Sequence, residues 1–270
     1  MRINQNISAM NTYSRLTAAN SAKSNSLAKL SSGLRINKAG DDAAGLAISE
    51  KMRGQVGGLN QAVRNAQDGI SLIQTAEGAL TETHSILQRM RDLAVQASTD
   101  TNTTADRTEI QKEVADLLEE IDRISTDTEF NTQTLLDGSF AGKVIHIGAN
   151  AEQKLDLDIA DMSASGLKVN DVSLETQSGA NTAITTIDDA IALVSSERST
   201  LGAKQNRLEH TINNLTATSE NLSAAESRIR DVDMAQEMME FTKNNILSQA
   251  ATSMLAQANQ MPQSVLQLLQ

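Results

Sequence analysis

Residues 184–229 read ITTIDDAIALVSSERSTLGAKQNRLEHTINNLTATSENLSAAESRI, and this stretch decides the fold. Its apolar side chains recur at steps of three and four residues, the spacing of one face of an α-helix: Ile184, Ile187, Ile191, Val194, Leu201, Leu208, Ile212, Leu215, Leu222 and Ile229. Only Arg198, Gln205, Ser219 and Glu226 interrupt this stripe. Because the stretch holds no proline and a single glycine, it predicts one helix of roughly 50 residues, about 75 Å long. Helices of this length are typical of coiled-coil-like bundles.

Four further segments show helical spacing. Residues 52–80 carry an apolar stripe that Glu77 interrupts, and a second stripe over 72–97 overlaps it, so the later half of this helix is expected to be covered from two sides. A shorter helix is predicted from about 105 to about 126. The N-terminal segment is less regular, with Ile3, Ile7 and Met10 on one face and Leu27, Leu30 and Leu34 on a slightly rotated track. The C-terminal segment fills successive a and d positions of a heptad, which predicts packing against partner helices: Leu247, Ala251, Met254, Ala258, Met261, Val265 and Leu268.

Residues 128–181 lack this helical spacing. Leu155, Leu157 and Ile159 alternate with aspartates, which is typical of a strand with one buried face. A β-branched run at 144–147 precedes the turn signal 148–150, so we expect an antiparallel hairpin at about 143–160. Segments 163–166 and 178–181 are expected to be loop. The predicted fold is therefore mainly α, a long-helix coiled-coil-like rod with a small β hairpin.

Composition excludes several classes of function. The chain of 270 residues has no cysteine or tryptophan, one proline and 1% aromatic residues, which argues against disulfides, thiolate metal sites and aromatic-lined cofactor pockets. His84, His146 and His210 lie far apart, and no motif of an enzyme or a phosphate-binding loop is present. We therefore expect no catalytic residue, no cofactor and no metal. No apolar run is long enough for a membrane span, and the N-terminus does not read as a cleavable signal.

The charge is distributed unevenly. The net charge is −11, yet residues 1–40 contain six basic residues and no acid, and residues 241–270 contain only Lys243. The acidic middle of the chain disfavours nucleic acid as a partner, whereas the two ends can approach other copies without strong repulsion. Ordering a terminal helix costs about 1–2 kcal/mol per residue, more than its apolar stripe recovers alone. Both ends are therefore expected to be largely disordered in the free monomer and to become helical when many copies pack.

Two residues and one cluster have alternative interpretations. The adjacent Asp41 and Asp42 could suggest a metal or acid pair, but we expect them to be helix-start residues. The cluster formed by Met234, Met238, Met239 and Phe241 is expected to pack where the long rod gives way to the terminal helix, with a groove for a partner as the alternative.

Several long motifs resemble those of bacterial flagellin. Residues 30–49, LSSGLRINKAGDDAAGLAIS, are similar to the N-terminal signature of that family. RINQN at 2–6, LQRMRDLAVQ at 87–96 and SVLQLL at 264–269 resemble it too, so the likeness covers roughly residues 1–140 and 185–270. The resemblance implies a secreted structural protein that polymerises into the extracellular flagellar filament for swimming motility. Only about 50 residues separate the second and third long helices, which indicates a short form without large outer domains.

The resemblance also implies a division of the chain. Residues 1–45 and 235–270 would form the inner core of the filament, 46–127 and 182–234 a helical rod, and 128–181 a solvent-facing hairpin and loop region. The expected polymerisation core consists of Ile3, Ile7, Met10, Leu27, Leu30, Leu34, Leu247, Ala251, Met254, Ala258, Met261, Val265 and Leu268.

The partners that the resemblance implies are other copies of the chain, an export chaperone on the C-terminal segment, and filament cap and hook-junction proteins. Export would use the flagellum-specific type III apparatus. In some flagellins a Toll-like receptor of animal hosts reads the residues that match Arg89, Leu93 and Glu113. The alternative function is a cytoplasmic helical-hairpin signalling or scaffold module, whose dimer would have a fixed size.

Overall fold

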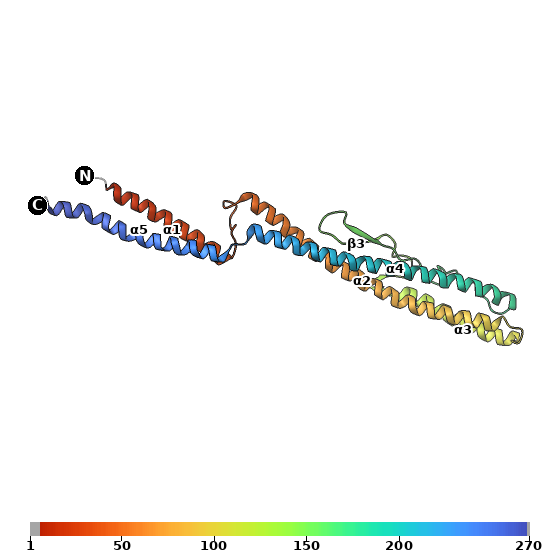
Figure 1. Cartoon of the computed structure of the whole chain (residues 1–270). Coiled ribbons are helices and arrows are strands. Elements are labelled where there is room, and N and C mark those ends of the chain that lie inside the picture. Colours follow the sequence, from red (N-terminus) through yellow and green to blue (C-terminus); the bar gives the residue numbers. More distant parts are fainter. Residues whose placement is uncertain (1–5, 269–270) are drawn as a thin grey trace. The chain divides into compact units, whose positions relative to one another are not determined.

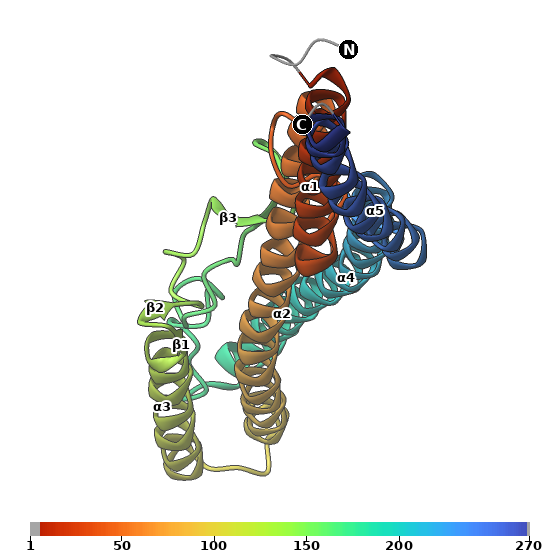
Figure 2. The ribbon, with the colours of Figure 1, turned by 90° about the vertical axis from the view of Figure 1, so that its left-hand side faces the viewer.

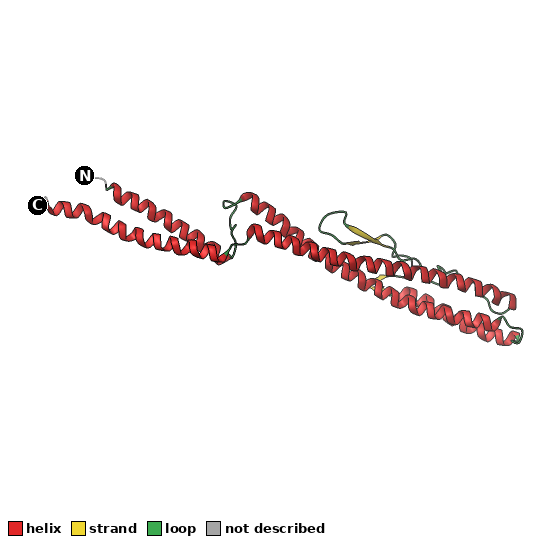
Figure 3. Ribbon diagram, in the orientation of Figure 1, coloured by secondary structure: helices red, strands yellow, loops and turns green. Residues whose placement is uncertain are grey.

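The computed structural model describes the backbone of residues 6–268 and the side chains of residues 6–260. Five helices dominate it, as Figure 3 shows. The helices are α1 (Ile7–Ser32), α2 (Ala43–Ala97), α3 (Thr104–Asp127), α4 (Gln177–Arg230) and α5 (Met234–Leu268). The mainly helical fold class is confirmed. Among the described residues, no helix has the length and hydropathy needed to cross a membrane.

The chain divides into two compact units. One unit, here called the terminal unit, contains residues 1–54 and 221–270, and the other, the middle unit, contains residues 55–220. α1 and α5 of the terminal unit lie side by side, as Figures 1 and 2 both show.

The middle unit is built around a continuous apolar core between its helices and the loops between α3 and α4. Leu80, Leu87, Val114, Ile121, Leu201 and Leu208 all belong to this core and are fully buried. These residues lie on the apolar stripes of the sequence, so the amphipathic pattern alone explains which helix faces turn inward. The predicted short helix corresponds to α3, and the predicted 50-residue helix to α4.

Two polar residues that interrupt the stripes face each other across this core. Arg198 of α4 lies 3.8 Å from Glu77 of α2, measured between Nη2 and Oε1, and both side chains are about one third exposed. A second pair, Arg91 with Asp188, joins the same helices at 2.6 Å. Because both pairs join α2 to α4 at defined levels, they help to fix the register between the two helices.

Helix ends in the middle unit follow local side-chain chemistry. Thr103 caps α3 and forms a capping box with Asp106, whose pKa is lowered because the Thr103 hydroxyl and backbone N–H donate to its carboxylate. Residues 178–181 were expected to be loop, and this prediction is wrong, since α4 begins at Gln177. The Thr176 hydroxyl accepts the N–H of Gly179 at 3.0 Å and so acts as the cap that starts the helix earlier.

The predicted hairpin is present. β3 (Lys143–His146) pairs antiparallel with β4 (Lys154–Leu157), and the alternating Leu155 and Leu157 are buried. Gly69 of α2 gives this hairpin room, because a Cβ there would lie 2.5 Å from Ile145 Cδ1. A smaller antiparallel pair, β1 (Glu129–Phe130) with β2 (Gln133–Thr134), was not expected from the sequence.

Candidate assembly surface of the terminal helices

The contact between α1 and α5 is made by small residues. Thr12, Ala19 and Ser26 are the buried residues of α1, and they are spaced seven apart. Ala251 and Ala258 of α5 are also buried and also seven apart. Such small side chains allow two helices to approach closely, yet they bury little apolar area per residue.

Polar side chains set the register of this contact. Three pairs join the helices: Lys23 with Asn245 at 2.9 Å, Asn20 with Ser248 at 2.8 Å, and Lys29 with Glu237 at 3.9 Å. Asn6 caps α1 by accepting the N–H of Ala9 at 3.1 Å, and its amide donates to the carbonyl of Ala258 at 2.8 Å. Positions rise along α1 while they fall along α5, so the two helices are antiparallel.

Leu16, Leu30, Phe241 and Leu255 of the terminal helices are half-buried, but the other ten large apolar side chains described on these helices lie mainly outside this contact. We call them the outer apolar face, and each is about half exposed or more: Ile7, Met10, Tyr13, Leu27, Met234, Met238, Met239, Ile246, Leu247 and Met254. Soluble monomers seldom gather so many large apolar residues on one small unit without a partner. Burial in the α1–α5 pair is thus inverted: its fully buried residues are small, and most of its large apolar side chains are exposed.

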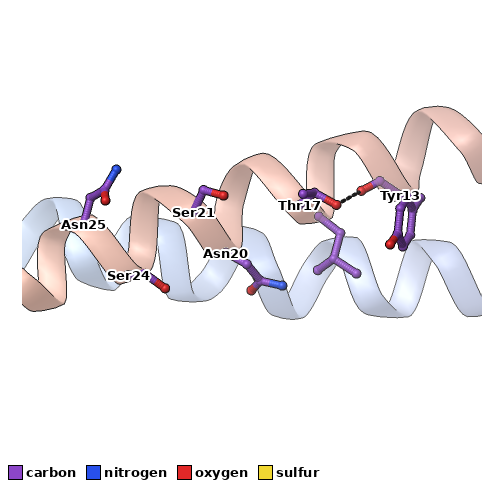
Figure 4. Close-up of a pocket in the computed structure, with 7 residues that line it drawn as sticks. Tyr13, Thr17, Asn20, Ser21, Ser24 and Asn25 are labelled. Atoms are coloured by element: carbon purple, nitrogen blue, oxygen red, sulfur yellow. Dashed lines mark hydrogen bonds between the residues drawn. The ribbon is translucent and has the colours of Figure 1, made fainter. Parts of the chain in front are cut away.

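Figure 4 shows Tyr13 and a row of small polar side chains that follow it along α1. A shallow groove of about 450 Å³ is lined by α1 alone: Tyr13, Leu16, Thr17, Asn20, Ser21, Ser24 and Asn25. The Thr17 hydroxyl donates to the carbonyl of Tyr13 at 3.0 Å, so it is already satisfied within the helix. The groove therefore combines one aromatic ring and one leucine with small polar groups.

The structure separates the residues expected to form one polymerisation seam. Ile7, Met10, Leu27, Leu247 and Met254 lie on the outer apolar face. Ala251 and Ala258 contact α1 instead, and Leu30 and Leu34 are half-buried. Ile3 lies outside the described residues, and Met261, Val265 and Leu268 lie in α5 with side chains that are not described.

Helix geometry explains why Leu247 and Met254 are exposed while Ala251 and Ala258 are buried. The spacing of three and four residues places Leu247 and Met254 beside, but not on, the line through Ala251 and Ala258. α1 covers that alanine line because only small side chains let the helices approach closely, and the larger side chains remain on the flank.

The methionine cluster was interpreted incorrectly. Met234, Met238 and Met239 were expected to be packed, but in the described part of the chain they are exposed. Only Phe241 of that cluster is half-buried. Met238 and Met239 follow Met234 by four and five residues. This spacing does not distinguish a helix face packed within the chain from one covered by another protein, because both faces are apolar.

A hydrogen-bonded loop follows α1 in the terminal unit. Gly33 ends the helix with φ 72°, a left-handed conformation that favours glycine. The N–H of Arg35 then donates to the carbonyl of Arg230 at 2.7 Å, and the N–H of Val232 donates to the carbonyl of Gly33 at 3.0 Å. These bonds tie the end of α1 to the chain that enters α5.

Asp42 acts as predicted, as a residue that starts a helix, whereas Asp41 bonds within the loop before that helix. The Asp42 carboxylate accepts the N–H of Gly45 at 2.8 Å in the first turn of α2. The Asp41 carboxylate accepts the N–H groups of Lys38 and Asn37, which lower its pKa below the ordinary value of 3.8. The Asp41 carboxylate thus orders the loop, and the Asp42 carboxylate caps the helix that follows it.

The residues matched to receptor recognition lie in the middle unit. Arg89 of α2 forms an ion pair with Glu113 of α3, with Nη2 and Oε1 2.7 Å apart, and both side chains are about half exposed. Leu93 lies one turn further along α2 and is only 2% exposed. In this unit, Arg89 and Glu113 present atoms at the surface, while Leu93 supports α2 from the core.

Comparison with known proteins identifies the family. Residues 3–141 match the bacterial flagellin N-terminal helical region, and residues 184–269 match the bacterial flagellin C-terminal helical region. The chain is 57% identical over 303 residues to flagellin from Bacillus subtilis (strain 168), with full coverage of both chains. It is 50% identical over 285 residues to the flagellar filament 33 kDa core protein of Treponema phagedenis, again with full coverage of both.

A solved structure supports the same conclusion. The crystal structure of Bacillus cereus flagellin matches with a TM-score of 0.52 and 36% sequence identity, over 60% of this chain and 94% of that chain. Family models at both ends of the chain, full-length relatives and a shared helical fold agree with one another. This chain belongs to the bacterial flagellin family.

Proposed function

We propose that this chain is a structural subunit of a bacterial flagellar filament and that it assembles with copies of itself through α1 and α5. The observation that carries the proposal is the inverted burial of the α1–α5 pair. This antiparallel pair buries small residues such as Ala19 and Ala251, while its outer apolar face remains in contact with water. Each fully buried Leu, Met or Ile side chain contributes roughly 1.5–3 kcal/mol, so covering this face by neighbouring copies supplies the missing stabilisation.

The geometry favours an open polymer. The outer apolar face belongs to two different helices, so a neighbour that covers one part of it leaves another part free for the next copy. Contacts between unlike surfaces of identical chains produce filaments when the rotation between copies does not close. The residues we assign to this polymerisation core are those of the outer apolar face, together with Ile3, Met261, Val265 and Leu268 from the heptad pattern.

This proposal assigns each segment of the chain to a part of the filament. Residues 1–45 and 235–270 form the inner core, 46–127 and 182–234 the rod, and 128–181 the solvent-facing region. Flagellins are structural proteins, and we infer a structural rather than an enzymatic role for this chain.

The filament places the assembled protein outside the cell, after export of the subunit. The exposed side chains of α5, such as Leu247 and Met254, offer an export chaperone a binding face before assembly. The filament cap and hook-junction proteins would contact the same helices at the ends of the polymer.

A host Toll-like receptor is a further proposed partner. The exposed Arg89–Glu113 pair offers it a polar contact, and Leu93 holds the underlying helix in place. Arg89→Ala monomers are expected to lose receptor signalling in a reporter assay because the contact itself is removed. Leu93→Ala monomers are expected to lose it because the surface shifts. Unchanged signalling by both variants would contradict the proposal.

Seeded growth tests the main proposal. Purified chains mixed with sheared filament fragments are expected to lengthen those fragments into tubes, as seen by electron cryomicroscopy, with α1 and α5 at the smallest radius. Sedimentation provides the control, because a signalling module would stop at a dimer of fixed size. Growth that stops at a small oligomer would overturn the proposal.

A further inference from the structure

The methionines of the two units differ in their exposure to solvent. In the middle unit Met90 is fully buried and Met162 is 4% exposed. In the terminal unit five methionines lie on the outer apolar face, with exposed fractions between 49% and 67%: Met10, Met234, Met238, Met239 and Met254. Met52 is half-buried. Among the methionines whose side chains the structure describes, the accessible thioethers are therefore concentrated where copies are proposed to meet.

We propose that these five methionines are sites of reversible oxidation by peroxide, and that their oxidation stops the chain from assembling. The inference rests on the proposed function, because it requires the outer apolar face to be the contact between copies. It concerns the free subunit, in which all five side chains reach solvent.

The chemistry is a transfer of one oxygen atom. The thioether sulfur attacks hydrogen peroxide, the O–O bond breaks, an S–O bond forms, and water leaves. Sulfur is oxidised by two electrons and the peroxide is reduced by two. A methionine sulfoxide reductase reverses the change, with two thiols oxidised to a disulfide and the oxygen released as water.

Oxidation changes this surface more than it changes the fold. Methionine is a flexible apolar side chain that fills irregular contacts, whereas its sulfoxide is polar and needs a hydrogen-bond partner when buried. Ile246 and Leu247, which are exposed on the same helix, are apolar and offer a sulfoxide no hydrogen bond. The core of the middle unit is spared, because Met90 and Met162 do not reach the oxidant.

Assembly protects the same side chains. Once neighbouring copies cover the outer apolar face, peroxide no longer reaches the sulfur atoms. Sensitivity should therefore belong to subunits that have not yet assembled, while a finished filament keeps its methionines reduced.

Brief treatment of the full-length monomer with hydrogen peroxide tests the inference. Peptide mass spectrometry is expected to find sulfoxide at the five exposed methionines but not at Met90 or Met162. The rate of seeded growth is expected to fall at least about tenfold, since a polar group must enter an apolar contact. A methionine sulfoxide reductase with dithiothreitol should restore the rate. Sulfoxide at these sites with unchanged growth would overturn the inference.

Two matched variants locate the effect. Both replace Met52 and Met261 by leucine, because the first is half-buried and the side chain of the second is not described, and both keep Met1. The test variant also replaces the five exposed methionines by leucine and is expected to grow at the same rate before and after peroxide. The control instead adds Met90→Leu and Met162→Leu and is expected to stay sensitive.

Each outcome of this comparison is informative. A test variant that loses its growth to peroxide as the control does would overturn the inference. If the test variant does not grow at all, the native chain still tests the inference. Recovery of growth when the reductase treats the oxidised native chain would support it, and no recovery after the sulfoxides are reduced would overturn it. Failure of untreated native chain to grow on seeds would instead count against the proposed function.

Discussion

Replacing Met254 by aspartate is expected to abolish filament formation and to leave the middle unit folded. Met254 is 61% exposed on α5 in the single chain, so the substitution disturbs few contacts within the fold. In the polymer the new carboxylate would enter an apolar contact, at a cost on the order of several kcal/mol per subunit. Electron microscopy of seeded samples reads the first effect, and thermal unfolding followed by circular dichroism reads the second.

Two controls separate charge from shape. Met254→Leu keeps an apolar side chain of similar volume and is expected to give normal filaments. Met254→Asn has the size and helix propensity of aspartate without its charge, and is expected to slow growth without preventing it. Normal filaments from the aspartate variant would show that this side chain does not lie between copies.

Replacing Leu208 by alanine is expected to destabilise the middle unit by about 2–5 kcal/mol. Leu208 lies on α4 and is fully buried in the core between the helices, so the shorter side chain leaves a cavity. Chemical denaturation of the monomer measures the change in the free energy of unfolding.

The matched control lies on the same helix. Leu193 is 47% exposed, and Leu193→Ala is expected to change stability by no more than about 0.5 kcal/mol. Equal effects of the two substitutions would mean that the apolar stripe of α4 does not face the core.

The long helices were predictable because their signal repeats. Some fifteen turns of α4 carry the same apolar step, so single interruptions such as Arg198 do not hide it. The interruption is itself informative once its partner is known, since Glu77 interrupts the stripe of α2 at the level where Arg198 meets it. The hairpin β3–β4 was predictable for a similar reason, because alternation with aspartate marks one buried face.

Short-range features were harder to predict. The turn between β1 and β2 uses Asn131 and Thr132 with φ of 49° and 61°, and threonine gives no sequence signal for this conformation. The loop before α4 also contributes buried side chains such as Leu167 and Leu174. These positions are set by the core that they cover rather than by local preference.

The assembly surface was predicted in part. The heptad pattern placed Leu247, Ala251, Met254 and Ala258 on one face of a helix, but the periodicity does not say which members face α1. Residue size decides this, because close packing selects the alanines and leaves Leu247 and Met254 outside. The exposed methionines carried no distinguishing signal, since an apolar residue looks the same whether its partner is in the chain or in another copy.

Amide hydrogen exchange, measured on dilute monomer and on filament, tests the central claim that neighbouring copies complete the terminal helices. The small-residue contact between α1 and α5 stabilises them weakly, so amides over 7–32 and 234–260 are expected to exchange rapidly in the monomer. The same amides should become strongly protected in the filament, while the helices of the middle unit are protected in both. Strong protection of α1 and α5 in the dilute monomer, unchanged by assembly, would contradict the claim.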